Sequence, residues 1–213
     1  MASKKAKEKA KKVMEVLEEL YPFDGTCFLD YDLAYPWQLL FATILSAQCT
    51  DAMVNKVTPI LFNKYPTLED FATANIGEIA DIIRPTGFAQ TKAKHLHQAA
   101  TQLLSNFDGQ LPGDIDKLVT LSGVGRKTAN VALSHIFKIP SIAVDTHVMR
   151  LSQKLGLTKN TDPVKIEFDL MAVLPRELWT RYNQQIISHG RAVCTARNPK
   201  CLGCRLAEWC LAK

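Results

Sequence analysis

The sequence predicts an all-α protein, and three observations support this. Apolar residues recur at helical spacing along almost the whole chain of 213 residues. No stretch shows the strict alternation of apolar and polar residues that is typical of a half-buried strand. The composition, 47% hydrophobic and 22% charged with ten Gly and ten Pro, excludes disordered, collagen-like and membrane-spanning chains. A chain of this length forms one large domain or two small ones.

The expected helices follow one another with short connections. A Lys-rich start continues into an apolar stripe over residues 13–20, which is typical of a helix with one solvated end. A strongly apolar helix is predicted from Trp37 to Leu45, and a second stripe over 54–61 extends up to Tyr65. Further helices are predicted at 67–73, 76–83, about 91–104, 115–121, 126–137, 146–155, 163–173 and 177–190.

The net charge of +5 says less than its distribution. Residues 4–12 hold six Lys and one Glu, so this short segment alone accounts for the total. Residues 13–118 carry six basic and fourteen acidic side chains, whereas residues 119–213 carry fourteen basic and six acidic ones. This asymmetry indicates a surface facing a polyanion in the second half of the chain, although charge also fluctuates along ordinary helical surfaces.

No segment resembles an export signal or a membrane span. The basic start has no apolar stretch behind it, and no run approaches the roughly twenty apolar residues that cross a bilayer. Six Cys in such a chain argue against a disulfide framework. We therefore expect no membrane partner and a cytoplasmic location, in association with the nucleoid if the source is bacterial.

Four of the six Cys lie near the end of the chain in a C-x6-C-x2-C-x5-C pattern, at Cys194, Cys201, Cys204 and Cys210. Four thiolates this close in sequence can converge on one metal centre, and the spacing alone leaves tetrahedral zinc and an iron–sulfur cube both open. Cationic side chains surround the four Cys, namely Arg191, Arg197, Lys200 and Arg205. They are expected to hold phosphates, to offset the thiolate charge, or to do both.

Residues 121–130, with the sequence LSGVGRKTAN, are the second informative segment. Two short helices joined by Gly123-Val124-Gly125 leave the first amides of the second helix open to a ligand. The glycines allow another backbone to approach closely, and a helix N-terminus favours an anion. The pattern predicts a hairpin that binds phosphate without reading bases.

Lys127 lies in the first turn of the second hairpin helix, where the macrodipole disfavours a cation. It is either one more phosphate contact or, in a positive and partly buried environment, a neutral amine that acts as a nucleophile. Such an amine can attack the anomeric carbon of a sugar, expel the base and form a Schiff base, after which the 3′-phosphate leaves by β-elimination. Asp145 would supply the carboxylate that this chemistry needs, but it also stands where a helix N-cap belongs.

Taken together, these segments resemble the endonuclease III family, the helix–hairpin–helix DNA glycosylases with a C-terminal [4Fe-4S] loop. The matching segments are residues 45–51 (LSAQCTD), the hairpin, residues 144–147 (VDTH), and residues 189–191 (HGR) leading into the four Cys. The resemblance implies two helical domains with DNA in the groove between them. A six-helix barrel would span 29–139 and contain the helix–hairpin–helix at about 115–137, and a discontinuous cluster domain would combine 1–28 with 140–213, its cluster loop at 194–210.

The resemblance also implies the residue roles. Lys127 would be the nucleophile, Asp145 would assist it, and the four Cys would ligate a mainly structural [4Fe-4S] cluster. Gln48 would fill the gap left by the extruded nucleotide, and Phe88 would wedge the strands. The further DNA contacts expected are Gly123, Val124, Gly125, Arg126, Thr128, His147, Arg191, Lys200 and Arg205.

Two positions depart from the family pattern. Ser122 replaces the usual Pro before the first hairpin glycine, and Phe88-Ala89-Gln90 replaces the more familiar Leu-Tyr-Asn. Neither departure affects the nucleophile, but the second leaves the wedge geometry and the opposite-base preference open.

The resemblance predicts a monomeric base excision repair enzyme with two activities. It would act as a DNA N-glycosylase and AP lyase on duplex DNA containing damaged pyrimidines or abasic sites, and it would remove oxidised pyrimidines. The alternatives are a thymine or uracil mismatch glycosylase of the same superfamily and a non-catalytic helix–hairpin–helix DNA-binding module. The hairpin Lys disfavours an adenine-removing mismatch glycosylase, and the DNA-binding scaffold disfavours a redox carrier.

Overall fold

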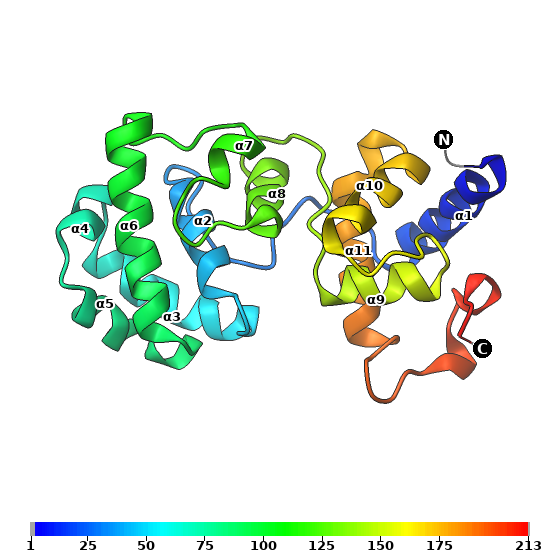
Figure 1. The fold of residues 1–213 in the computed structure, drawn as a ribbon. Coiled ribbons are helices and arrows are strands. Elements are labelled where there is room, and N and C mark those ends of the chain that lie inside the picture. The colour runs from blue at the N-terminus through cyan, green and yellow to red at the C-terminus, as the bar shows by residue number, and fades with distance from the viewer. Residues whose placement is uncertain (1–2, 213) are drawn as a thin grey trace. The chain divides into compact units, whose positions relative to one another are not determined.

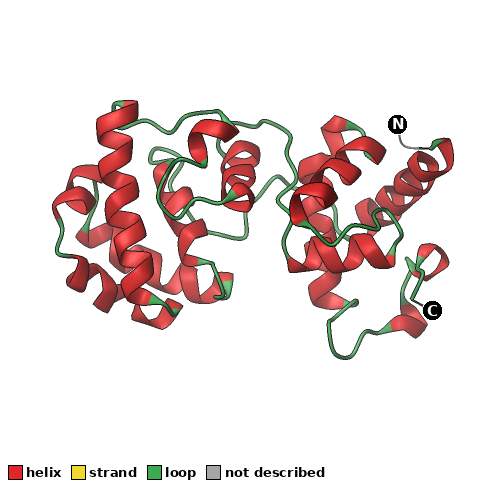
Figure 2. Ribbon diagram, viewed as in Figure 1, coloured by secondary structure: helices red, strands yellow, loops and turns green. Residues whose placement is uncertain are grey.

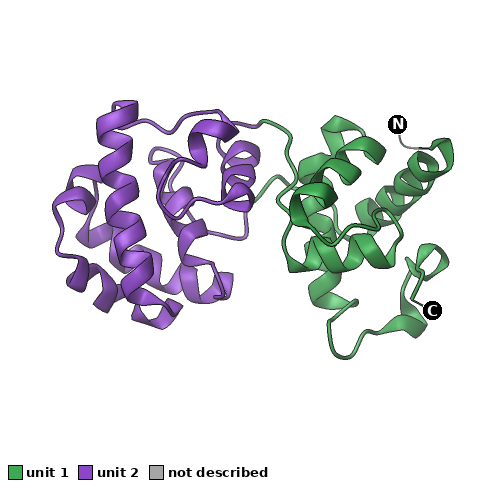
Figure 3. Cartoon of the chain, viewed as in Figure 1, with its two compact units in different colours: residues 1–26, 139–213 green, residues 27–138 purple. Residues whose placement is uncertain are grey.

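The computed structural model describes residues 3–212, and within this range it contains helices and no strand (Figures 1 and 2). The all-α prediction is confirmed, with 63% of the chain helical. The chain forms two compact units, one of residues 27–138 and the other of residues 1–26 with 139–213 (Figure 3). The divisions therefore fall one or two residues before those expected from the sequence.

The unit of residues 27–138 is built around one fully buried helix. All nine residues of α2 (Trp37–Leu45) are buried, and none of them is charged. Trp37 and Phe41 lie with ring centroids 5.3 Å apart, and Phe71 completes the cluster at 4.9 Å from Phe41. A helix that is apolar on every side must be surrounded by other helices. α2 packs against α3 (Asp51–Lys64), α6 (Ala89–Phe107) and α8 (Arg126–His135). The unit also contains α4 (Leu68–Thr73), α5 (Ile76–Ile83), the 3₁₀ turn η1 (Arg84–Thr86) and α7 (Ile115–Leu118).

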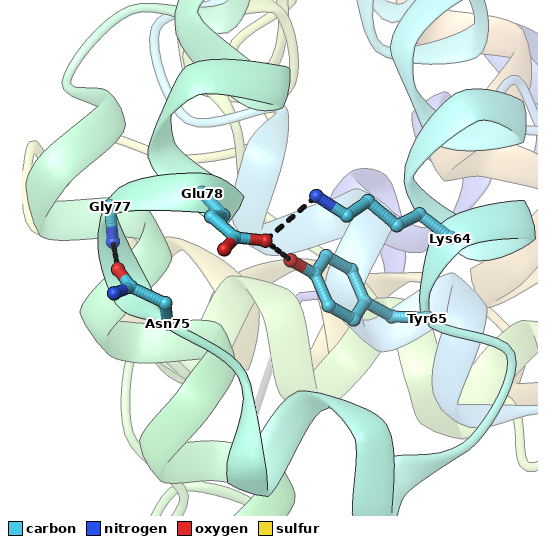
Figure 4. Close-up of polar contacts among 5 residues, drawn as sticks. All are labelled: Lys64, Tyr65, Asn75, Gly77 and Glu78. Carbon is cyan, nitrogen blue, oxygen red and sulfur yellow. Dashed lines mark hydrogen bonds and ion pairs between the residues drawn. The ribbon is translucent and has the colours of Figure 1, made fainter.

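Polar side chains fix the helix ends on the α3–α5 side of this unit (Figure 4). Lys64 Nζ donates to Glu78 Oε2 at 2.8 Å, and the Tyr65 hydroxyl donates to the same oxygen at 3.3 Å. Asn75 caps α5 by accepting a hydrogen bond from the Gly77 amide at 2.8 Å. The two bonds to Glu78 join the end of α3 to the start of α5, and the Asn75 bond caps α5.

The second unit combines the first helix with the C-terminal part of the chain. α1 (Lys4–Leu20) buries a stripe that includes Val13 and Leu17 and leaves most of its Lys side chains exposed, which confirms the predicted solvated helix end. Gln185 of α11 (Trp179–Ala192) donates to the Glu18 carboxylate at 2.6 Å and to the Tyr21 carbonyl at 3.0 Å, so α11 is tied to α1. The remaining elements are α9 (Thr146–Lys154), α10 (Pro163–Val173), η2 (Arg176–Leu178), η3 (Cys201–Gly203) and η4 (Ala207–Trp209). None of the helices within residues 3–212 has the length and apolar character needed to cross a bilayer.

Candidate functional site

The hairpin predicted from the sequence is present and is formed by α7, a tight turn and α8. Gly123 takes φ +77°, a conformation that side-chain-bearing residues rarely adopt. Val124 is buried, and its amide donates to the Leu121 carbonyl at 3.0 Å, which closes the turn. Gly125 occupies the N-cap position of α8, where it offers no side chain to the first amides of that helix. This arrangement leaves the hairpin suited to an anion at the start of α8.

Ser122, which departs from the family pattern, docks the hairpin on α6. Its amide donates to Gln102 Oε1 at 2.7 Å, and its hydroxyl donates to Gln98 Oε1 at 2.8 Å. The same hydroxyl lies 2.9 Å from Nδ1 of His95. A proline could make none of these bonds because it lacks both the amide hydrogen and the hydroxyl. The departure therefore replaces a stiff residue with a polar anchor.

The basic residues of the hairpin differ in their exposure. Lys127 is exposed, so the partial burial expected from the sequence is wrong. Arg126 is half-buried, and Thr128 is buried at 8% exposure. Lys127 is thus the amine of this turn that an incoming ligand can reach, while Thr128 packs inward.

Gln48 and Phe88 both occupy turns in the same unit as the hairpin. Their φ angles are +54° and +50°, and only two other non-glycine residues within residues 3–212 have positive φ. Gln48 is exposed, and Phe88 is 64% exposed, which is unusual for so large an apolar side chain. Phe88 is therefore a surface residue and not part of the core.

Asp145 begins α9 in the other unit. Its Oδ1 accepts a hydrogen bond from the Val148 amide at 2.7 Å, so the residue is the N-cap that its position predicted. Its Oδ2 lies 3.4 Å from Nδ1 of His147, and both side chains remain partly exposed. One carboxylate oxygen is thus used in the cap and fixes the side chain, and the other faces His147. Lys127 belongs to the other unit, that of residues 27–138.

The four Cys of the C-terminal segment line one pocket of about 60 Å³. None of the four forms a disulfide bond. A tetrahedral zinc site would need its sulfurs at about 2.3 Å from one ion. Among residues 3–212, no three His, Cys, Asp or Glu side chains converge in this way. The pocket that the four Cys share offers only thiolate ligands, which suits an iron–sulfur cluster.

His189 and Arg150, which lie outside the predicted set, make contacts beside this pocket. Nε2 of His189 lies 3.5 Å from Sγ of Cys204, and Nδ1 of the same ring lies 3.2 Å from the Tyr21 hydroxyl. Burial lowers the pKa of His189, so the ring is neutral and carries one proton. When Tyr21 donates to Nδ1, that proton lies on Nε2 and faces the sulfur. Arg150 adds a second anchor by donating to the Cys194 carbonyl at 2.7 Å.

The cations around the Cys segment are exposed, and Arg205 bonds a carboxylate of α1. Arg205 donates from Nη2 to Glu19 Oε2 of α1 at 2.5 Å. Lys200 and Arg191 are exposed at the surface, and the Lys200 amide donates to the Val193 carbonyl at 2.9 Å. Part of the positive charge in this region therefore serves to attach the Cys segment to α1.

Sequence reasoning missed Lys92, which is 4% exposed and bonds two backbone carbonyls. A signal was present, because Lys92 shares the helical face of Leu96, Ala99 and Leu103, all of which are fully buried. The sequence contains no comparable signal for the contacts of His189 and Ser122, because these contacts join residues that are far apart in the chain.

Comparison with known proteins gives consistent results across the chain. Residues 41–176 match the HhH-GPD superfamily of base excision DNA repair proteins, and residues 194–210 match the iron–sulfur binding domain of endonuclease III. Endonuclease III of Synechocystis sp. is 52% identical over 99% of this chain and 94% of its own length. Endonuclease III of Bacillus subtilis is 43% identical over 82% of this chain and 80% of its own length.

Solved structures extend the comparison to the fold. A trapped endonuclease III–DNA covalent intermediate is 38% identical, with a TM-score of 0.92 and coverage of 99% of this chain and 97% of that one. A thermostable thymine-DNA glycosylase is 21% identical with a TM-score of 0.82, which shows a shared fold alone. The protein is a DNA glycosylase/AP lyase with a [4Fe-4S] cluster. The chain belongs to the endonuclease III family of helix–hairpin–helix base excision repair proteins.

Proposed function

We propose that Lys127 is the nucleophile with which this glycosylase/AP lyase removes oxidised pyrimidines from duplex DNA. The observation that carries the proposal is the exposure of Lys127 in the first turn of α8, directly after a glycine N-cap. The hairpin amides and the helix N-terminus would hold a phosphate of the damaged strand beside this amine.

The chemistry follows from the amine. Nζ of Lys127 attacks the anomeric carbon, the bond to the base breaks, and the base leaves with its electron pair and takes up a proton. The sugar ring then opens to a Schiff base, which acidifies the hydrogen on C2′. Loss of that proton expels the 3′-phosphate, and water finally hydrolyses the imine and returns the lysine.

The carboxylate of Asp145 would support this step by stabilising positive charge that develops on the sugar. Its capping bond to the Val148 amide holds the side chain in one orientation, and its second oxygen remains on the side of His147. The N-cap role and the catalytic role are compatible, because the cap uses only one of the two oxygens.

In this proposal Cys194, Cys201, Cys204 and Cys210 are the ligands of the [4Fe-4S] cluster. Their common pocket supports the assignment. The bound cluster would hold the basic segment around Lys200 in a fixed shape, so that its cations meet the DNA backbone. We further propose that Gln48 and Phe88 enter the duplex when the damaged nucleotide leaves the stack, that the protein acts as a monomer, and that it works in the cytoplasm, where bacterial DNA is found.

Borohydride trapping tests the nucleophile. A duplex with one thymine glycol should give a covalent adduct with the wild-type protein and none with Lys127→Ala. Lys117→Ala is the matched control, because Lys117 is an exposed cation of the same hairpin in α7. A Lys127→Ala protein that still forms the adduct would refute the assignment.

A lesion panel tests the substrate class. Base release and strand cleavage are measured separately on duplexes with thymine glycol, dihydrouracil, 5-hydroxycytosine or a uracil or thymine mismatch. Faster base release from the oxidised pyrimidines supports the proposal, whereas a preference for the mismatches would favour a mismatch glycosylase.

A further inference from the structure

Lys92 is a buried lysine in the first turn of α6. Its side chain is 4% exposed and lies on the apolar face of the helix. Its ammonium donates to the Leu45 carbonyl at 2.7 Å and to the Thr86 carbonyl at 2.8 Å. One nitrogen therefore joins two chain segments that are 41 residues apart in numbering, from 45 to 86.

The two carbonyls explain how a lysine can occupy this interior position. Leu45 is the last residue of α2, and Thr86 is the last residue of η1. Carbonyls at a helical C-terminus have no intrahelical donor and carry partial negative charge. Burial lowers the pKa of Lys92, and the nearby Cys49 thiol group opposes this effect. The ammonium satisfies two acceptors that would otherwise be buried without a partner.

Both carbonyls lie immediately before strained turns. Gln48 follows Leu45 by three residues, and Phe88 follows Thr86 by two. Both have left-handed backbone conformations, which non-glycine residues keep only where the surrounding structure imposes them. The bonds from Lys92 fix the base of each turn, so the ammonium is the contact that the two turns share.

We propose that Lys92 is a positioning residue, which sets the spacing of the Gln48 and Phe88 turns so that both side chains enter the duplex together. This inference rests on the proposed function, in which Gln48 fills the gap and Phe88 wedges the strands. Lys92 itself touches neither DNA nor the reacting atoms in this scheme.

The inference separates two steps of the reaction. Base removal from a duplex requires the damaged nucleotide to leave the stack, which is the step that filling and wedging support. β-Elimination at an abasic site in a single strand requires no extrusion. Loss of the Lys92 bonds should therefore slow the first reaction and spare the second.

The test variant is Lys92→Met, which keeps the length and the apolar stem of the side chain but removes the donors. Lys94→Met is the matched control, because Lys94 is an exposed lysine of the same helix and the change in charge is equal. Single-turnover base release from a thymine glycol duplex should fall about 10- to 100-fold in Lys92→Met, as expected for a small misplacement of positioning groups. Strand cleavage of a single-stranded abasic oligonucleotide should stay within about twofold of the wild-type rate in both variants.

A double-mutant cycle distinguishes positioning from a general loss of structure. In a Gln48→Ala/Phe88→Ala background, Lys92→Met should have no further effect on base release from the duplex. An equal loss in both backgrounds would overturn the inference, and so would an equal loss of single-strand cleavage. If Lys92→Met does not fold, the same cycle is run with Lys92→Arg, whose planar fork presents donors in a different geometry, and the same two results decide.

The cycle also keeps this inference apart from the proposed function. If the Gln48→Ala/Phe88→Ala protein releases the base from the duplex as fast as wild type, the filling and wedging roles are wrong. If that protein is slow but Lys92→Met is not, those roles stand and the role of Lys92 is wrong.

Discussion

Replacing Gly123 with alanine should destabilise the protein, because the hairpin turn has no room for a side chain there. A Cβ atom at this position would lie 2.8 Å from Cβ of His95 and 2.9 Å from its Cγ. These two atoms lie close to the His95 backbone, so they cannot move aside as the end of a flexible side chain could. His95 is also held by its hydrogen bond to the Ser122 hydroxyl at 2.9 Å.

The expected magnitude combines two costs. A φ of +77° costs an alanine about 1–2 kcal/mol more than it costs glycine. Overpacking against His95 adds about 1–3 kcal/mol. The free energy of unfolding of Gly123→Ala should therefore fall by about 3 kcal/mol, which at a urea dependence of about 2–3 kcal/mol per molar lowers the midpoint by about 1–1.5 M.

Gly125→Ala is the matched control, two residues further along the same turn. Gly125 has φ −88°, and a Cβ atom there would meet no heavy atom within 4 Å. The small loss from a poorer N-cap and the gain from a less flexible unfolded chain nearly cancel, so the free energy of unfolding should change by less than about 1 kcal/mol. The added methyl group would, however, stand where the DNA backbone is proposed to approach, so affinity for duplex DNA should fall.

Urea unfolding followed by far-UV circular dichroism measures stability, and fluorescence anisotropy of a labelled duplex measures affinity. A Gly123→Ala midpoint within about 0.3 M of wild type would refute the packing argument. A Gly125→Ala protein with wild-type stability and wild-type affinity would refute the close approach of DNA to this glycine.

Two further predictions concern one imidazole in each unit. Burial, and then the charge of Lys138, lower the pKa of His135 to about 4. Below pH 6.5, His135 therefore binds a proton in the unfolded chain but stays neutral in the folded chain until the pH approaches 4. The free energy of unfolding should therefore fall by about 2–3 kcal/mol between pH 7 and pH 4.5 because of this residue. His135→Gln should remove this contribution, as measured by urea unfolding at pH 7 and pH 4.5. A variant with the pH dependence of the wild type would contradict the prediction. Tyr21→Phe removes the hydroxyl that faces His189 Nδ1 and so frees the ring to place its proton away from Cys204. Loss of visible absorbance in the presence of an iron chelator should be about tenfold faster than in wild type, whereas equal rates would show that the contact does not support the cluster.

Most helices could be predicted from the sequence because their apolar stripes are regular. α2 and α10 have the predicted limits, and α5 does as well. α6 begins two residues earlier and ends three residues later than expected, since its start is set by the turn at Gly87 and Phe88 and not by an apolar residue. The two 3₁₀ turns of the Cys segment were not predicted, because short turns in a metal-binding segment have no apolar period.

The site shows a similar division. Lys127 could be identified because a short motif places it at a helix start, and the four Cys because their spacing is local. The exposure of Lys127 could not be predicted, since it depends on how the hairpin packs on α6. The hydrogen bonds of Lys92 could not be predicted either, because residues 92 and 45 come together only in the folded chain. Contacts of this kind depend on tertiary packing, and helical periodicity says nothing about them.

The positive φ angles of Gln48 and Phe88 support a functional role for the two turns. Asp108 ends α6 in the left-handed conformation, where helices commonly stop and where Asp is tolerated. Phe88 has no such local reason. It is the N-cap of α6, a position that favours Ser, Thr, Asp or Asn, and it is exposed and left-handed as well. Stability alone does not account for an aromatic residue under these three disadvantages, which supports the proposed role of Phe88 in wedging the DNA strands.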